Sequence, residues 1–233
     1  MEGNIMRRKI ILYLYKHHAL HWILWLFHRT VGCNQFIRMK GSNIVDSSTA
    51  NIYKDAFIVK HGTNNRVIIG EKSDLHNSII TFKGTNNTVR IGKNGFLNGL
   101  NIIVEGDNGQ LIIGDNAFIL GDTRIYVVDG ATFKMGDGCM LSDRIEIRTT
   151  DNHSIIDRST GKRINYEKDI VLHDNVWIGT GVTILKGVEL ANACIVGAAS
   201  VITKKLMKES SVIAGNPARV VRENVYWRME RIK

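Results

Sequence analysis

The chain lacks most of what a disulfide-stapled, secreted or membrane-spanning protein needs. Its 233 residues include three cysteines and one proline, and no apolar run approaches the roughly 20 residues that cross a bilayer. No signal peptide is expected, because the apolar run near the start is short and no small-residue cleavage site follows. Three cysteines form no even disulfide set, so we expect reduced thiols in a cytoplasmic protein; Cys139 and Cys194 fall at repeat positions for small side chains, and Cys33 stays unexplained.

Acidic residues are missing between Gly3 and Val45, and this segment carries most of the net charge of +9. Residues 1–44 are also aromatic, and their apolar positions indicate one or two short helices. Two interpretations stay open for residues 1–40: packing on the end of the fold or on another subunit, and peripheral contact with the inner face of an anionic cell membrane. Nucleic acid is not expected as a partner, because no recognised nucleic-acid module accompanies the charge.

A repeat with a fixed period is the strongest signal present. Pairs of a bulky apolar residue and glycine follow one another every 22 residues: Ile69-Gly70, Ile91-Gly92, Ile113-Gly114 and Met135-Gly136. A fixed period indicates a stacked repeat architecture. Within each unit a bulky apolar residue recurs every six residues, as in Ile91, Leu97 and Ile103, and four turn-forming residues complete the unit.

From Ile170 onward the extra turn residues disappear and the hexads run without interruption. Their first places hold Ile170, Val176, Val182, Val188, Cys194 and Ser200, and their third places hold Leu172, Ile178, Ile184, Leu190, Val196 and Ile202. This pattern predicts an all-β solenoid, a left-handed parallel β-helix over residues 45–222, with the helical segment 1–44 before it and a short helix or tail at 223–233. A β-sandwich would have no reason to keep a spacing of six.

The hexad pattern fails from residue 149 to residue 169, and a polar excursion of this length is usually functional. It contains His153 beside Asp151 and Asn152. A neutral imidazole can take a proton from a hydroxyl near neutral pH, if a carboxylate or carbonyl at its other nitrogen orients the ring. From the residues alone, a solvated loop histidine is the simpler interpretation.

Four segments stand in a fixed order: T-T-D-N-H-S-I, D-N-V-W-I-G-T-G-V-T-I-L-K-G-V, I-V-G-A-A-S-V-I-T-K and A-G-N-P-A-R-V-V-R. Together they resemble the hexapeptide acetyltransferases, in particular the galactoside, maltose and polysaccharide O-acetyltransferase branch. The resemblance implies an acyltransferase that moves acetyl from acetyl-CoA to a sugar hydroxyl of a cell-surface polysaccharide or its precursor. It implies His153 as the general base for direct attack on the thioester. It places Trp177 at the thioester end of the cofactor groove, where an indole N–H suits a developing oxyanion.

The resemblance carries the acetyl-CoA site onto Thr180, Gly197, Ala198, Thr203, Lys204, Arg219 and Arg222. The backbones of Gly197 and Ala198 are expected to offer donors to the pantetheine arm, and the three cations to neutralise phosphates. The alternative for each cation is an ordinary surface position, and for Trp177 it is packing at a subunit interface. The family also implies a homotrimer with active sites between subunits, and no metal.

Three other functions stay open. A zinc enzyme on this fold needs clustered histidines, but His61, His76, His153 and His173 give no close pair. A non-catalytic β-helix scaffold explains the coils but not His153 together with Trp177 and the G-N-P-A-R ending. An acetyltransferase for a small sugar or a nucleotide-sugar amine shares the fold. The sequence does not name the acceptor.

Overall fold

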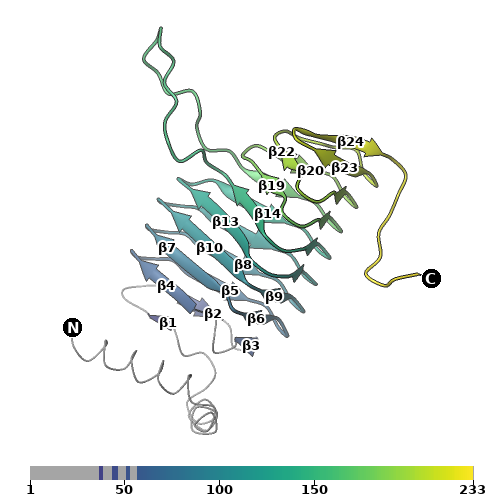
Figure 1. Cartoon of the computed structure of the whole chain (residues 1–233). Coiled ribbons are helices and arrows are strands. Elements are labelled where there is room, and N and C mark those ends of the chain that lie inside the picture. Colours follow the sequence, from purple (N-terminus) through teal and green to yellow (C-terminus); the bar gives the residue numbers. More distant parts are fainter. Residues whose placement is uncertain (1–36, 39–43, 47–50, 53–56, 233) are drawn as a thin grey trace, which may run out of the picture. The chain divides into compact units, whose positions relative to one another are not determined.

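The computed structural model describes residues 37–38, 44–46, 51–52 and 57–232 of the chain. They form a left-handed parallel β-helix, in which each coil contributes one strand to each of three sheets (Figure 1). This confirms the predicted all-β solenoid. The compact unit that contains it runs from Phe36 to Lys233. The basic, aromatic segment that the sequence predicts to be helical, with Cys33, lies outside the described residues.

The three sheets are called A, B and C here. Sheet A holds, in order, β1 (Ile37–Arg38), β4 (Phe57–His61), β7 (Ile79–Lys83), β10 (Leu100–Glu105), β13 (Thr123–Val128), β16 (Ile145–Arg148), β19 (Thr183–Ile184) and β22 (Val201–Ile202). Sheet B holds β2 (Ile44–Asp46), β5 (Arg66–Ile69), β8 (Thr88–Ile91), β11 (Gln110–Ile113), β14 (Thr132–Met135), β17 (Ile170–Leu172) and β20 (Glu189–Leu190). Sheet C holds β3 (Asn51–Ile52), β6 (Asp74–His76), β9 (Phe96–Asn98), β12 (Phe118–Ile119), β15 (Met140–Leu141), β18 (Trp177–Ile178), β21 (Ile195–Val196), β23 (Val212–Gly215) and β24 (Ala218–Arg222).

The hexad pattern predicts the core well, because alternate side chains along each strand point into the narrow prism. The predicted interior residues that are buried are Ile69, Leu75, Ile91, Leu97, Ile113, Ile119, Ile125, Met135, Leu141 and Ile147 in the long coils, and Ile170, Leu172, Val176, Ile178, Val182, Ile184, Val188, Leu190, Cys194, Val196, Ser200 and Ile202 in the short ones. Ile103 is the exception, since Ile102 and Val104 are buried and Ile103 points outward. Counting back 22 residues from Ile125 gives Ile103, whereas the strand register pairs Ile125 with Ile102.

The repeated glycines have a steric cause. Gly114 does not have a positive φ, but a Cβ on it would lie 2.4 Å from Oδ1 of Asp137 in the next coil. The same oxygen accepts a hydrogen bond of 2.7 Å from the backbone N–H of Asp115. The contact recurs one coil later, where Asp174 Oδ1 would meet a Cβ on Gly136 at 2.1 Å. Glycine therefore leaves room for a carboxylate that ties one coil to the next.

Two departures from the regular coils position the candidate site. Residues 149–169 leave the solenoid between β16 of sheet A and β17 of sheet B and form a protruding arm (Figure 1). At the other end, β24 turns back antiparallel on β23, and residues 223–232 continue as an extended segment, which we call the C-terminal strap. Of the helix or tail predicted for the C-terminal segment, the structure therefore shows a tail. In the part of the chain that the structure describes, no helix meets the length and apolarity that crossing a membrane requires.

Candidate active site

The arm is an antiparallel hairpin that begins directly after β16. Ile156 and Arg163 form an antiparallel bridge, and the N–H of Ile164 donates to the carbonyl of Ile155 at 2.9 Å. At the tip, Asp157 accepts hydrogen bonds from Ser159 and Thr160, and these lower the pKa of Asp157 to about 2. The arm is therefore an ordered hairpin built from local polar contacts.

His153 lies at the base of the arm, and its backbone is fixed more firmly than its ring. Its N–H donates to the carbonyl of Asp151 at 2.8 Å, and its own carbonyl accepts a hydrogen bond of 2.8 Å from Nδ2 of Asn165. Asn165 is buried and also binds the backbone N–H of Ile155 at 2.7 Å. The side chain of His153 is exposed, and its imidazole has no hydrogen-bond partner among the described residues. This leaves the ring available to a ligand.

The carboxylate of Asp151 binds other groups than the imidazole. It forms an ion pair with Nζ of Lys186, a residue that follows β19, and it accepts a hydrogen bond of 2.9 Å from Asn165. The hydrogen bond from Lys186 is the main reason that the pKa of Asp151 is held below its ordinary value, and the bond from Asn165 adds to it. Lys186 also donates to the carbonyl of Asn165 at 2.9 Å. Asp151 therefore anchors the arm to the solenoid.

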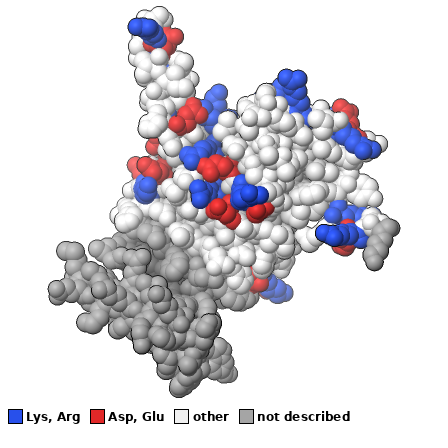
Figure 2. Space-filling view, in the orientation of Figure 1, with Lys and Arg blue, Asp and Glu red and all other residues white. Residues whose placement is uncertain are grey.

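A second ion pair, between Arg163 and Glu167, lies on the second strand of the arm. Arg163 donates to Oε1 of Glu167 at 2.6 Å, and the hydroxyl of Thr150 donates to the same oxygen at 3.1 Å. Burial acts to raise the pKa of Glu167, but these hydrogen bonds outweigh it and hold the pKa below its ordinary value. Acidic and basic side chains accordingly gather near the point where the arm leaves the solenoid (Figure 2).

Trp177 lies on β18 of sheet C, where it is paired in register with Met140 and Ile195. Its indole N–H is enclosed and has no hydrogen-bond partner in the described part of the chain. The ring of Trp227, from the C-terminal strap, lies 6.0 Å from it between centroids, at an interplanar angle of 47°. In the sequence, Trp227 falls within the helix or tail expected at residues 223–233, and no spacing links it to Trp177.

The residues expected at the cofactor occupy two regions of the last coils. Thr180, Gly197 and Ala198 lie at the corner between sheets C and A in successive coils, where Ala199 N–H donates to the carbonyl of Thr180 at 2.8 Å. The hydroxyl of Thr180 donates to Asp143, and this bond is the main cause that lowers the pKa of Asp143. One expectation is wrong: the N–H of Gly197 already donates to the carbonyl of Ile213 at 2.8 Å, so it is no free donor.

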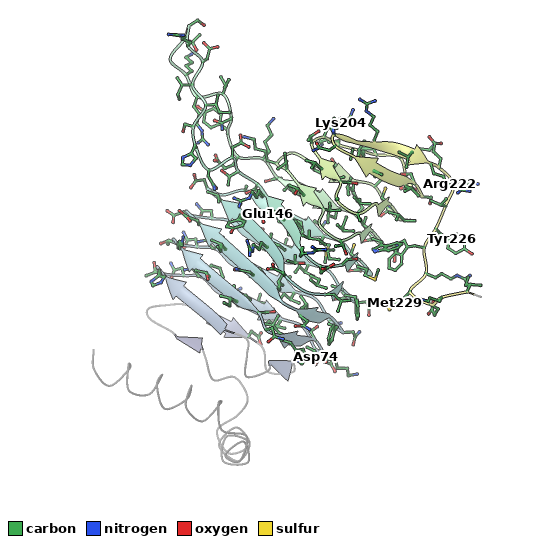
Figure 3. The ribbon with its side chains drawn as sticks, viewed as in Figure 1. Asp74, Glu146, Lys204, Arg222, Tyr226 and Met229 are labelled. Carbon is green, nitrogen blue, oxygen red and sulfur yellow. The ribbon has the colours of Figure 1, made fainter. Side chains whose placement is uncertain are left out.

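The candidate phosphate ligands are exposed. Thr203 and Lys204 follow β22, whereas Arg219 and Arg222 lie on β24, and Figure 3 shows Lys204 and Arg222 well apart on the last coils. None of the three cations forms an ion pair within residues 57–232. They are thus available to an anionic ligand that extends across this end of the solenoid.

Within one chain, His153 and Trp177 lie on different sides of the solenoid. The arm leaves at the corner between sheets A and B, and Trp177 projects from sheet C, the face opposite that corner. His173, which follows β17 in the short coils, binds Glu189 of sheet B at 3.1 Å. Among the described residues no group of three or more His, Cys, Asp or Glu side chains is placed to hold a metal ion.

Comparisons with known proteins agree with the β-helix fold. The family model for bacterial transferase hexapeptide (six repeats) matches residues 169–204. Polysialic acid O-acetyltransferases of Escherichia coli O1:K1 / APEC and Neisseria meningitidis are 34% and 35% identical over 89 residues, 38% of this chain. These matches span 29% and 41% of the two relatives. The crystal structure of the polysialic acid O-acetyltransferase OatWY aligns with a TM-score of 0.70 at 32% identity, over 83% of this chain and 93% of that chain.

Proposed function

The chain belongs to the hexapeptide-repeat acetyltransferases, and we propose that it transfers an acetyl group from acetyl-CoA to a sugar hydroxyl of a cell-surface polysaccharide or its precursor. The observation that carries this proposal is the exposed imidazole of His153, whose backbone is fixed by Asn165 while its ring has no partner in the described part of the chain. The similarity to polysialic acid O-acetyltransferases supports a polysaccharide acceptor, and polysialic acid is the first to test.

His153 acts as the general base. Its neutral imidazole accepts the proton of the acceptor hydroxyl while the hydroxyl oxygen bonds to the thioester carbonyl carbon. The carbon–sulfur bond then breaks, and the departing thiolate takes the proton held by His153 and leaves as the thiol, so the enzyme returns to its starting state. Because the carboxylate of Asp151 is engaged by Lys186 and Asn165, it contributes by holding the backbone of the arm.

Trp177 supplies the donor for the negative charge that develops on the carbonyl oxygen. A prearranged N–H in an enclosed place stabilises such charge better than water does, because it needs no reorganisation. The N–H of Trp177 has no hydrogen-bond partner among the described residues, which leaves this donor for the role. Thr180 and Ala198 line the corner along which the pantetheine arm runs, with Thr203 and Gly197 beside it. Lys204, Arg219 and Arg222 bind the phosphates of coenzyme A.

The active form is a homotrimer in which each site takes His153 from one subunit and Trp177 from the next. Two features of the single chain support this. The two residues lie on different sides of the coil, and the arm exposes large apolar side chains that a partner would cover. These are Ile155, Ile156, Ile164 and Tyr166, each more than half exposed.

The test is thiol release from acetyl-CoA with polysialic acid, neutral polysaccharides, galactosides and amino sugars as acceptors, followed by analysis of the acetylated product. His153→Ala is expected to lower turnover about a hundredfold or more, as the loss of a general base does, with acetyl-CoA binding unchanged. His173→Ala is the matched control, since its ring is bound to Glu189 and it should leave turnover nearly unchanged. Equal turnover in the His153→Ala protein and the wild type would end the assignment. Acetylation of an amine in place of a hydroxyl would favour the amine-specific alternative.

For residues 1–40 we retain the two interpretations, packing against the trimer and contact with the inner face of the cell membrane. Liposome binding by the full chain and by a chain that begins at Asn34 separates them. Equal binding by the two would remove the membrane role.

A further inference from the structure

The C-terminal strap returns along the solenoid to the candidate site. Asn224, with a φ of 58°, reverses the chain after β24, and the N–H of Val225 then donates to the carbonyl of Ser210 at 2.9 Å. Two residues later, Nε1 of Trp227 donates to the carbonyl of Asn175 at 2.7 Å. Asn175 lies two residues before the start of β18, so the strap runs back past the last coils. Figure 3 shows the strap on this side, with Tyr226 and Met229 on it.

The strap uses one large side chain to reach the solenoid. Tyr226 and Met229 are 69% and 58% exposed, whereas Trp227 is partly buried against the ring of Trp177. An exposed strap of this length has little else to hold it in place. The contact between the two indoles is therefore a specific feature of the strap and not a general burial of apolar residues.

The two indoles differ in what their N–H groups do. The N–H of Trp227 is occupied by the carbonyl of Asn175, so this ring is anchored. The N–H of Trp177 is enclosed and has no partner in the described residues. An enclosed donor without a partner is unfavourable and uncommon in a folded protein, so it calls for an explanation such as a catalytic role or a bound water. The anchored ring thus packs on the ring whose donor is free.

We propose that Trp227 is a positioning residue for acetyl transfer, which fixes the orientation of the Trp177 indole so that its N–H meets the reacting carbonyl oxygen. The inference rests on the proposed function, in which Trp177 is that donor. Trp227 does not donate to the carbonyl oxygen itself, because its own N–H is bound to Asn175. It restricts the ring of Trp177 from the side of the strap, while Met140 and Ile195 flank it along sheet C.

The test compares Trp227→Ala and Trp227→Phe in the full chain, with Tyr226→Ala as the matched control on the same strap. If the Trp177 N–H is no longer held in its orientation, the rate of the chemical step falls. Trp227→Ala is therefore expected to reduce kcat about tenfold with little change in KM for acetyl-CoA. Trp227→Phe keeps an aromatic ring but loses the hydrogen bond to Asn175, so its kcat should lie between those of the wild type and Trp227→Ala. Near-ultraviolet circular dichroism should lose the signal of the paired indoles in Trp227→Ala and keep it in Tyr226→Ala.

A double-mutant comparison makes the result specific. If Trp227 acts through Trp177, then adding Trp227→Ala to a Trp177→Phe protein lowers kcat no further. Two results would overturn the proposal while leaving acetyl transfer in place: an unchanged kcat in Trp227→Ala although the indole signal is lost, or a rise in KM for acetyl-CoA alone, which would make Trp227 part of the cofactor wall. Absence of acetyl transfer by the unaltered chain would overturn both this inference and the proposed function.

Discussion

Nδ2 of the buried Asn165 donates a hydrogen bond of 2.8 Å to the backbone carbonyl of His153, across the two strands of the arm. The same nitrogen donates to the carboxylate of Asp151, and Oδ1 accepts from the N–H of Ile155. One side chain thus binds the backbone at His153 and Ile155 and the carboxylate of Asp151. The imidazole stays outside this network, which is the arrangement that a base needs if it is to meet a substrate without competing partners.

Replacement of Asn165 by aspartate should therefore impair turnover more than folding. The carboxylate keeps an acceptor for Ile155 but loses both donated hydrogen bonds and places a negative charge beside Asp151. We expect kcat to fall about tenfold to a hundredfold, because a small displacement of a catalytic group costs this much. Amide hydrogen exchange at Ile155 reports whether the arm has opened. Wild-type kcat together with faster exchange would show that the position of His153 does not depend on Asn165.

The ion pair between Lys186 and Asp151 should give the arm a pH dependence of known sign. The pKa of Asp151 is lowered in the folded protein from an ordinary value of 3.8, so the pair contributes stability above that pH and loses it as pH falls through the lowered pKa. Lys186→Met should then destabilise the protein near neutral pH by about 1 kcal/mol or less, since Asp151 is partly exposed.

The difference in unfolding free energy between wild type and Lys186→Met, followed by chemical denaturation, should shrink below pH 3.8. Lys162→Met, on the exposed arm, is the matched control and should show no such trend. A difference that grows as the solution becomes more acidic would contradict the assignment of the pair.

The core was predictable from the sequence because its constraint is periodic. Each strand turns its alternate side chains into a prism with little room, so bulky residues such as Ile119 and Leu141 recur at a fixed interval. The same counting failed at Ile103, where the register between β10 and β13 differs by one residue from that between the earlier coils. A side-chain period of two then turns Ile103 outward.

The surroundings of the candidate site were less predictable, because they depend on contacts between distant or irregular segments. His153 and Trp177 stand out through their resemblance to a family. Lys186 looks like an outward corner residue, and no spacing relates it to Asp151. Trp227 lies 50 residues after Trp177, in a segment without periodicity, so its contact with that ring follows only from the path of the strap.

Gly114 tests whether the repeated glycines are required by space. A Cβ there would lie 2.4 Å from Asp137 Oδ1 and 2.6 Å from the backbone of Gly136. Because part of this clash is with backbone, Gly114→Ala should destabilise the protein by about 1–3 kcal/mol, the usual cost of overpacking. Lys134→Ala, at an exposed position of β14, is the control for thermal unfolding. Equal unfolding midpoints for wild type and Gly114→Ala would show that the coils can separate to admit a methyl group.

If the site is shared between subunits, two variants that are each inactive should restore activity when they are combined in one trimer. His153→Ala and Trp177→Phe should each be nearly inactive alone. If each site takes His153 from one subunit and Trp177 from its neighbour, random mixing of equal amounts of the two chains gives about a quarter of the sites both native residues. Co-expression should therefore restore about a quarter of wild-type turnover, measured as thiol release per subunit.

Mixing His153→Ala chains with chains that carry both substitutions is the control, because no native site forms. If both residues came from the same chain, co-expressing the two single variants would restore nothing, because neither chain contains a complete pair. Recovery therefore requires that the arm of one subunit reaches sheet C of another, which would also cover the exposed Ile155, Ile156 and Tyr166. The apolar surface of the arm and the separation of the two residues in one coil would then have a single cause.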